Sequence, residues 1–201
     1  MLLSTEEIAL AANADVLLTK NRIIEAVYQM FGRLADTYRN GVIQLPQTLT
    51  RQHPKISRGE NYLGLPWVIL DYPRNFTNPD VFAARTMFWW GNYVSLQLLL
   101  KGACLQMLNA SKMLDTLPGA EWFFCIGSTP WQHHFEENYM QPLITLTPEL
   151  IDHQKEKNGF FKIGTKLPVT QWNNAEAFLQ ERFSDILGCV LPVPAVMQDT
   201  G

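Results

Sequence analysis

Residues 131–137 combine two adjacent histidines with two adjacent glutamates, the side chains best suited to acid–base or metal chemistry in this chain. Imidazole and carboxylate groups are ligands of zinc and non-haem iron, and a histidine beside a glutamate is a common acid–base pair. His133 and Glu137 share a face on either a helix or a strand. We therefore consider four residues as candidate metal ligands: His133, His134, Glu137 and, from a following helix, His153.

This segment also has a simpler interpretation. Only one histidine and one or two carboxylates converge locally, whereas a catalytic metal site uses about three protein ligands. Glu149, Asp152 or His153 could supply the third ligand, but an exposed polar segment explains the pattern as well. A metal-assisted or acid–base hydrolase is accordingly the second of two functional hypotheses.

The first hypothesis comes from an aromatic-rich stretch, residues 62–93, which holds nine of the 23 aromatic residues. Arginines are interleaved with these rings. Flat rings beside guanidinium groups can stack on a planar ligand and pair with its carboxylate or phosphate. The candidate ligand-binding residues are Arg58, Tyr62, Trp67, Arg74, Arg85, Trp89 and Trp90.

The same rings could instead fill a core or form an interface between copies of the chain. Aromatic residues favour strands, and Trp, Tyr and Arg are the usual anchors of protein interfaces. Adjacent Trp89 and Trp90 must face opposite sides of a strand, so one of them meets a second layer, a ligand or a partner. Core filling, a homo-oligomer and a ligand pocket therefore remain open.

The sequence lacks the motifs for nucleophilic catalysis and for phosphate binding. Residues 127–130, Gly-Ser-Thr-Pro, are not a nucleophile elbow, and no glycine-rich phosphate loop occurs. Cys125 stands between two apolar residues, where burial raises the pKa of a thiol and leaves it inert. The sequence assigns no cofactor.

Composition limits the partners. Of the 201 residues, 47 % are hydrophobic and 17 % charged, below the usual ~25 %, which suggests that another subunit covers some surface. The net charge of −3 argues against a nucleic-acid partner, which requires a strongly basic face. One short basic stretch contains Arg51, His53, Lys55 and Arg58.

A soluble, cytoplasmic protein is the expected context. Three cysteines without a CxxC pair fit reduced thiols better than a disulfide framework. The N-terminus shows no basic region before an apolar run. No stretch approaches the ~20 apolar residues that cross a membrane.

Residues 1–41 are predicted to be helical. Ser4 and Glu7 form a capping box, and Ile23, Val27, Phe31, Leu34 and Tyr38 recur at helical spacing. A break near residues 13–15 or at Thr19 divides this segment into a helical pair, because a single helix would be unusually long.

Beyond a predicted loop at 41–61, period-two and turn signals predict strands. The expected strands are 63–71, 81–89, 93–100, 121–126 and 160–165, and residues 90–92 are expected to form a hairpin connection. Helices are expected at 103–114, from Thr147 to Asn158, and from Asn173 to Gly188.

These elements predict one α+β domain over residues 1–201, with an antiparallel or mixed sheet of about five strands. A helical N-terminal segment (1–41) and the C-terminal helix pack on a sheet-and-helix part (62–188), and an extended tail follows (189–201). Its expected role is to bind a small planar or anionic ligand, or to self-associate through the aromatic strands.

Overall fold

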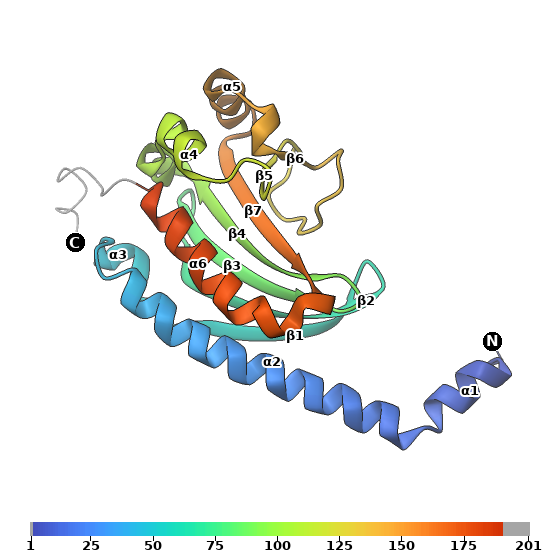
Figure 1. Cartoon of the computed structure of the whole chain (residues 1–201). Helices are drawn as coiled ribbons and strands as arrows, with labels where there is room; N and C mark the ends of the chain where they lie inside the picture. Colours follow the sequence, from blue (N-terminus) through green and yellow to red (C-terminus); the bar gives the residue numbers. More distant parts are fainter. Residues whose placement is uncertain (1, 191–201) are drawn as a thin grey trace.

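A computed structural model describes residues 2–190, which form one α+β domain around a single antiparallel sheet (Figure 1). The predicted α+β class is confirmed, but the sheet has seven strands rather than about five. The strand order is β1-β2-β3-β4-β7-β5-β6. The strands are β1 (Lys55–Tyr62), β2 (Leu65–Phe76), β3 (Val81–Trp89), β4 (Tyr93–Lys101), β5 (Trp122–Cys125), β6 (Met140–Pro142) and β7 (Phe160–Pro168).

Two strands were not predicted. β1 occupies part of the segment interpreted as a loop, because an edge strand that is mostly exposed needs no apolar alternation. β6 has only three residues, too few to produce a periodic signal. Both strands are edge strands of the sheet.

Strands β1 to β4 form a meander of consecutive antiparallel pairs. The predicted hairpin at residues 90–92 is confirmed between β3 and β4. Gly91 adopts a φ of 70° there, which glycine reaches without steric cost. β7 then pairs with β4 on one side and with β5 on the other, so the chain returns to the middle of the sheet.

The helices α2 (Ala14–Gly41) and α6 (Ala175–Gly188) cover one face of the sheet, which we call the helical face (Figure 1). The predicted stripe of α2 is buried from Val27 onward. The Tyr38 ring stacks on Phe183 of α6 with centroids 3.7 Å apart, and its hydroxyl lies 3.0 Å from the hydroxyl of Thr86. The two helices and the sheet thus share one core.

The N-terminal break is confirmed. The short helix α1 (Thr5–Ala11) starts with the predicted capping box, in which the Ser4 amide donates to Glu7 over 2.6 Å. Asn13 caps α2 by accepting from the amides of Asp15 and Val16. α1 therefore ends before α2 begins, and α1 and the first turns of α2 project beyond the sheet (Figure 1).

The remaining helical elements differ in detail from the prediction. A 3-10 segment, η1 (Gly102–Met107), precedes α4 (Ala110–Thr116) where one helix was expected, and α3 (Gln47–Thr50) precedes β1. α5 (Pro148–Asn158) starts after Thr147 and ends at Gly159 with φ 68°, as predicted. Short 3-10 turns, η2 (Leu143–Thr145) and η3 (Val169–Asn174), complete the order.

α6 begins two residues later than predicted and has no side-chain cap. Glu176, in the first turn of α6, accepts two hydrogen bonds from Arg33 of α2, at 2.8 and 2.7 Å. The predicted tail lies almost wholly outside the described residues, beyond Val190.

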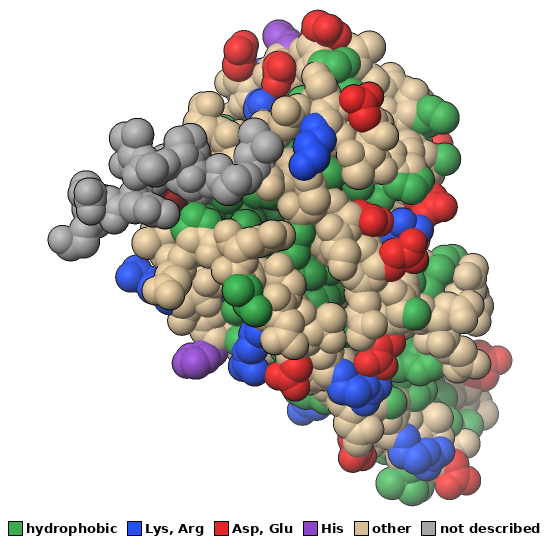
Figure 2. Space-filling model, turned by 60° about the vertical axis from the view of Figure 1, so that its left-hand side comes forward, with side chains coloured by type: hydrophobic (Ala, Val, Ile, Leu, Met, Phe, Trp, Pro, Cys, Tyr) green, Lys and Arg blue, Asp and Glu red, His purple; other side chains and the backbone are tan. Residues whose placement is uncertain are grey.

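Two hydrophobic clusters lie on opposite faces of the sheet. The larger cluster fills the helical face. The smaller one lies on the other face, which we call the loop face because the segment 126–139 crosses it. None of the helices in residues 2–190 has the length and hydropathy needed to span a membrane. Figure 2 shows acidic and basic side chains interspersed on the face drawn.

Candidate ligand site

Three polar side chains lie side by side on the loop face because of strand register. Asp71 of β2 pairs with Arg85 of β3, and Arg85 pairs with Gln97 of β4. Gly164 of β7 follows opposite Gln97. Directly paired residues of an antiparallel sheet project from the same face, so an acid, a guanidinium and an amide form one row across the sheet.

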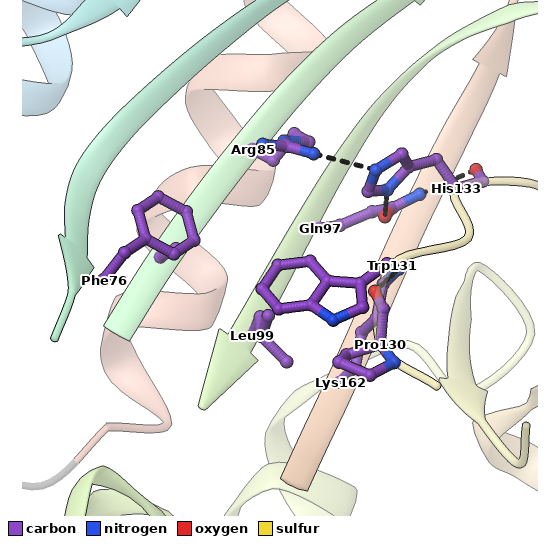
Figure 3. Close-up of a pocket in the computed structure, with 9 residues that line it drawn as sticks. Phe76, Arg85, Gln97, Leu99, Pro130, Trp131, His133 and Lys162 are labelled. Atoms are coloured by element: carbon purple, nitrogen blue, oxygen red, sulfur yellow. Dashed lines mark hydrogen bonds between the residues drawn. The ribbon is translucent and has the colours of Figure 1, made fainter. Parts of the chain in front are cut away.

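The crossing segment, residues 126–139, places His133 over this row. The His133 amide donates to the Tyr62 hydroxyl over 2.6 Å, and the Gln97 amide donates to the His133 carbonyl over 2.9 Å. These contacts come from β1 and β4, so the backbone at His133 is held from two strands. The imidazole therefore has a fixed position above Arg85 and Gln97 (Figure 3).

The imidazole of His133 is neutral with a defined tautomer. Nη1 of Arg85 lies 2.8 Å from Nε2, and because a guanidinium only donates, Nε2 must be the unprotonated nitrogen. Nδ1–H then donates to Oε1 of Gln97 over 3.2 Å. Burial, together with the nearby Lys162 and Arg85 charges, lowers the pKa of His133 to about 2.

Arg85 keeps unused donors. Its Nε and Nη2 donate to the two carboxylate oxygens of Asp71 at 2.7 and 2.9 Å, and its Nη1 donates to His133. These three bonds use three of the five N–H groups of a guanidinium. Within residues 2–190 the other two have no protein acceptor, and the side chain remains about a quarter exposed.

Lys162 of β7 anchors the crossing segment from below. Its ammonium donates to the carbonyls of Pro130, at 2.8 Å, and Gln132, and lies 3.4 Å from the Tyr139 hydroxyl. Three acceptors match the three N–H groups of an ammonium. Burial lowers the pKa of Lys162 to about 7, with Arg85 adding to the effect and Cys125 opposing it.

A cavity of about 20 Å³ lies between the sheet and the crossing segment. This is room for about one water molecule. Trp131 and Phe76 stand at its edge, 55 % and 39 % exposed, with ring centroids 6.5 Å apart. The residues around it are Phe76, Ala83, Arg85, Gln97, Leu99, Pro130, Trp131, His133 and Lys162 (Figure 3).

A row of aromatic rings continues the loop face beyond His133. Successive rings meet edge to face, with centroids 5.3 to 5.4 Å apart. The Lys166 ammonium lies 5.2 to 5.5 Å from the centroids of three of them, and burial lowers its pKa. The rings in order are Tyr62, Trp89, Tyr93, Phe135 and Phe123.

The structure brings together only some of the residues that the sequence proposed for ligand binding. Tyr62, Trp67, Arg85 and Trp89 all belong to the loop face. Trp89 also donates its indole N–H to the Tyr62 carbonyl over 3.2 Å. Of these residues, Tyr62 and Arg85 contact His133 directly.

The other three candidates lie apart from this group. Arg58 is exposed and pairs with Val68, a residue of the helical-face core, so Arg58 projects toward that opposite face. Trp90 packs against the same helical-face core. Arg74 donates to the His53 carbonyl over 2.8 Å. The three arginines therefore do not converge on one cavity.

The four candidate metal ligands are also dispersed. His133 already uses both ring nitrogens, and the His134 ring packs beside Tyr139 at 4.8 Å. Glu137 and His153 are exposed. Among the described residues, no three His, Cys, Asp or Glu side chains gather closely enough to hold a metal ion. The metal hypothesis stays a prediction from sequence.

Sequence reasoning missed Asp71, Gln97 and Lys162, although each carried a signal. Each is a polar residue that directly follows an apolar one in its strand, in Ile69–Leu70–Asp71, Leu96–Gln97–Leu98 and Phe161–Lys162–Ile163. Their exposed fractions are 7 %, 3 % and 2 %. Buried polar groups require partners, so such positions indicate a polar network on one face.

Comparisons with protein-family models, curated proteins and solved structures found no match.

Proposed function

We propose that the protein binds a small planar anion at the cavity formed by Arg85, His133, Phe76 and Trp131. The observation that carries this proposal is the guanidinium of Arg85, which lines the cavity and retains two N–H donors. A fork of guanidinium donors matches the geometry of a carboxylate or phosphate.

The neighbouring charges favour an anion. Asp71 neutralises part of the Arg85 charge, but Lys162 also lines the cavity and His133 is neutral. A neutral His133 adds no charge of either sign to the cavity. Because Asp71 balances Arg85 and the pKa of Lys162 is about 7, the surroundings of a bound anion are net positive when Lys162 is protonated. In such a partly water-excluded site a charge-assisted hydrogen bond is strengthened.

The size of the cavity and the rings at its edge favour a ligand with a planar body. The enclosed space of about 20 Å³ admits only a terminal polar group, so the rest of the ligand must lie at the edge. Trp131 and Phe76 stand there with large exposed fractions. Two separated rings are suited to contacting a flat apolar body, because aromatic faces stack on planar groups.

The network favours binding over acid–base catalysis. A general base needs a free lone pair within reach of a substrate proton. The Nε2 lone pair of His133 is occupied by Arg85, and burial holds its pKa at about 2. Its position is better suited to holding Arg85 than to moving a proton.

Benzoate is a suitable probe, since it joins a flat ring to a carboxylate. We expect calorimetry to detect benzoate binding, with weaker binding of cyclohexanecarboxylate because its ring is not flat. Arg85→Gln should weaken benzoate binding by about tenfold or more, since a charge-assisted hydrogen bond is worth ~1.5–3 kcal/mol. Arg58→Gln, on the opposite face, is the matched control and should bind as the wild type does.

A second variant tests the site without changing the buried network around Arg85. Trp131 is 55 % exposed, so Trp131→Ala should retain the fold and still weaken benzoate binding. Circular dichroism and thermal melting would establish that each variant is folded. No benzoate binding by the wild type, or equal binding by a folded Arg85→Gln variant, would overturn the proposal.

A further inference from the structure

The N-terminal arm, residues 2–26, contacts little of the rest of the protein. α1 has no buried residue, and the first buried residue of α2 is Val27. α1 spans seven residues, whereas isolated helices shorter than ~12–15 residues are marginal in water. A capped helix of this length in an exposed position requires stabilisation from a surface outside the arm.

The arm also concentrates the exposed apolar side chains. More than half of the large hydrophobic residues with high exposure in residues 2–190 belong to it, so the arm is the most apolar exposed segment described. An apolar surface of this kind marks an interaction site. These arm residues are Leu2, Leu3, Ile8, Leu10, Val16, Leu17, Leu18 and Ile23.

The α2 part of the arm continues the stripe that packs on the sheet. Val27, Met30 and Leu34 are buried under the helix, and Val16 and Ile23 precede them at the same spacing of threes, fours and sevens. The stripe thus extends about three turns beyond the last buried position. The outer part of this stripe has the residue spacing of a buried helix face. Within residues 2–190 of one copy of the chain, nothing covers it.

A groove lies at the base of the arm. Two adjoining cavities, of about 290 and 450 Å³, share Ile23 and Trp90. Phe88, Trp90 and Trp172 supply aromatic walls, with Phe88 at 5.4 and 5.6 Å from the two indole rings. The smaller cavity is therefore apolar, and both are large enough to receive helical side chains. The lining of the larger cavity includes Asp15, Val16, Thr19 and Lys20.

The distribution of charge along the arm favours one orientation of a second copy of the arm. Glu6 and Glu7 lie in α1, whereas the first turns of α2 hold Arg22, Asp15 and Lys20, of which Lys20 is paired with Glu60 of β1 at 2.9 Å. Two arms side by side in antiparallel orientation would place the acidic α1 of one copy against Arg22 of the other. A parallel arrangement would oppose like charges. The arm is thus complementary to a second, antiparallel arm.

We propose that α1 of one copy lies in the groove of a second copy, and that two arms exchanged in this way form a symmetric dimer. Glu6 then opposes Arg22 of the other copy, and the twofold axis passes near the break between α1 and α2. Each arm contributes roughly 20 residues, which approaches the ~20–30 residues a side of a stable protein interface. This interface is separate from the cavity on the loop face.

Sedimentation velocity on the full chain tests the dimer, with charge reversal testing the arrangement. We expect the wild type to dimerise, and Glu6→Arg and Arg22→Glu each to weaken dimerisation by about tenfold or more. In each variant, like charges would meet twice across the twofold axis. Ile8→Glu should weaken it as well, whereas Ile144→Glu, exposed elsewhere on η2, should not.

Mixing the two charge-reversed variants shows whether Glu6 and Arg22 contact each other between two copies or within a single copy. A mixture of Glu6→Arg and Arg22→Glu chains should recover the wild-type affinity as a heterodimer, because both contacts are then between opposite charges. A wild type that remains monomeric at every concentration would overturn the proposal. So would a mixture that stays as weak as its components, or a dimer insensitive to Ile8→Glu.

Discussion

Arg85 donates to Nε2 of His133 over 2.8 Å, and this contact determines where the imidazole carries its proton. The proton is on Nδ1, which donates to Gln97. Gln97 in turn donates to the His133 carbonyl, so the amide and the histidine are joined twice. The row Asp71–Arg85–His133–Gln97 consequently has a single consistent hydrogen-bonding pattern while His133 is neutral.

The neutrality of His133 predicts a loss of stability in acid. The unfolded histidine binds a proton near pH 6.5, whereas in the folded protein its pKa is about 2. Between these values the unfolded state binds more protons, so the free energy of unfolding decreases as pH falls below 6.5. The decrease is at most about 1.4 kcal/mol per pH unit.

Urea unfolding from about pH 7 down to about pH 4 would measure this slope. His133→Gln should show a shallower decrease than the wild type, since it removes the titrating group. His153→Gln, at an exposed position on α5, should retain the wild-type slope. Parallel curves for the wild type and His133→Gln would contradict the expected linkage.

Asp71→Asn should destabilise the protein by about 2–3 kcal/mol. The loss is expected below the ~3–5 kcal/mol of a fully buried ion pair, because Arg85 is about a quarter exposed. The double variant Asp71→Asn/Arg85→Gln should lose less than the sum of the two single variants, since the pair acts as a unit. Chemical denaturation of all four proteins gives the coupling energy, and strict additivity would show that the pair contributes none.

Gly164→Ala should destabilise the protein by about 1–3 kcal/mol, the usual range for overpacking. A Cβ at this position would lie 2.9 Å from the side chain of Gln97 and 3.0 Å from the Phe135 ring. The matched control is Gly188→Ala at the end of α6, where a Cβ would meet nothing within 4 Å. Thermal melting compares the two, and equal melting temperatures would mean that Gln97 and Phe135 move at little cost.

Lys162→Met should loosen the crossing segment. The substitution leaves the Pro130 carbonyl without its donor and the Gln132 carbonyl with the Tyr139 hydroxyl alone, at a cost of about 1–3 kcal/mol. Hydrogen exchange of amides in residues 128–134 should accelerate more than that of β3 and β4. Lys166→Met, on the same face of β7, tests for a general effect of losing a lysine there. Unchanged exchange in the crossing segment would exclude an anchoring role for Lys162.

Phe183→Ala should cost about 3–5 kcal/mol, because this ring is 2 % exposed and stacks on Tyr38 between α2 and α6. Leu150→Ala, at a position 48 % exposed on α5, provides the contrast and should have little effect. Urea denaturation would measure both changes. Near-wild-type stability of Phe183→Ala would require a rearranged contact between the two long helices.

Sequence reasoning found the elements whose signals are local. The capping box at Ser4, the stripe from Val27 to Tyr38, and the turn at Gly91 each depend on residues a few positions apart. The sequence pattern did not predict β1 because an edge strand is defined by its partner. Lys55 to Gly59 pair with β2, although their own burial is irregular. Local propensity carries no information about that pairing.

The site was predictable only in part, for the same reason. Arg85, Tyr62 and Trp89 could be identified as a group because they lie within one aromatic stretch. Arg58 lies just before that stretch, and its pairing with Val68 directs it to the other face. Gln97 and Lys162 join Arg85 through the β3–β4 and β4–β7 registers, which involve residues up to 77 positions apart in the numbering and leave no local pattern.

The insertion of β7 between β4 and β5 has a consequence for assembly of the fold. β5 and β6 connect to the rest of the sheet only through β7, whereas β1 to β4 pair with their neighbours in chain order. The meander can form by successive hairpins. β5 and β6 can join the sheet only after β7, which comes later in the chain, has paired with β4. We therefore expect the proposed anion site to be completed late in folding, because the crossing segment follows β5 and Lys162, which anchors that segment, belongs to β7.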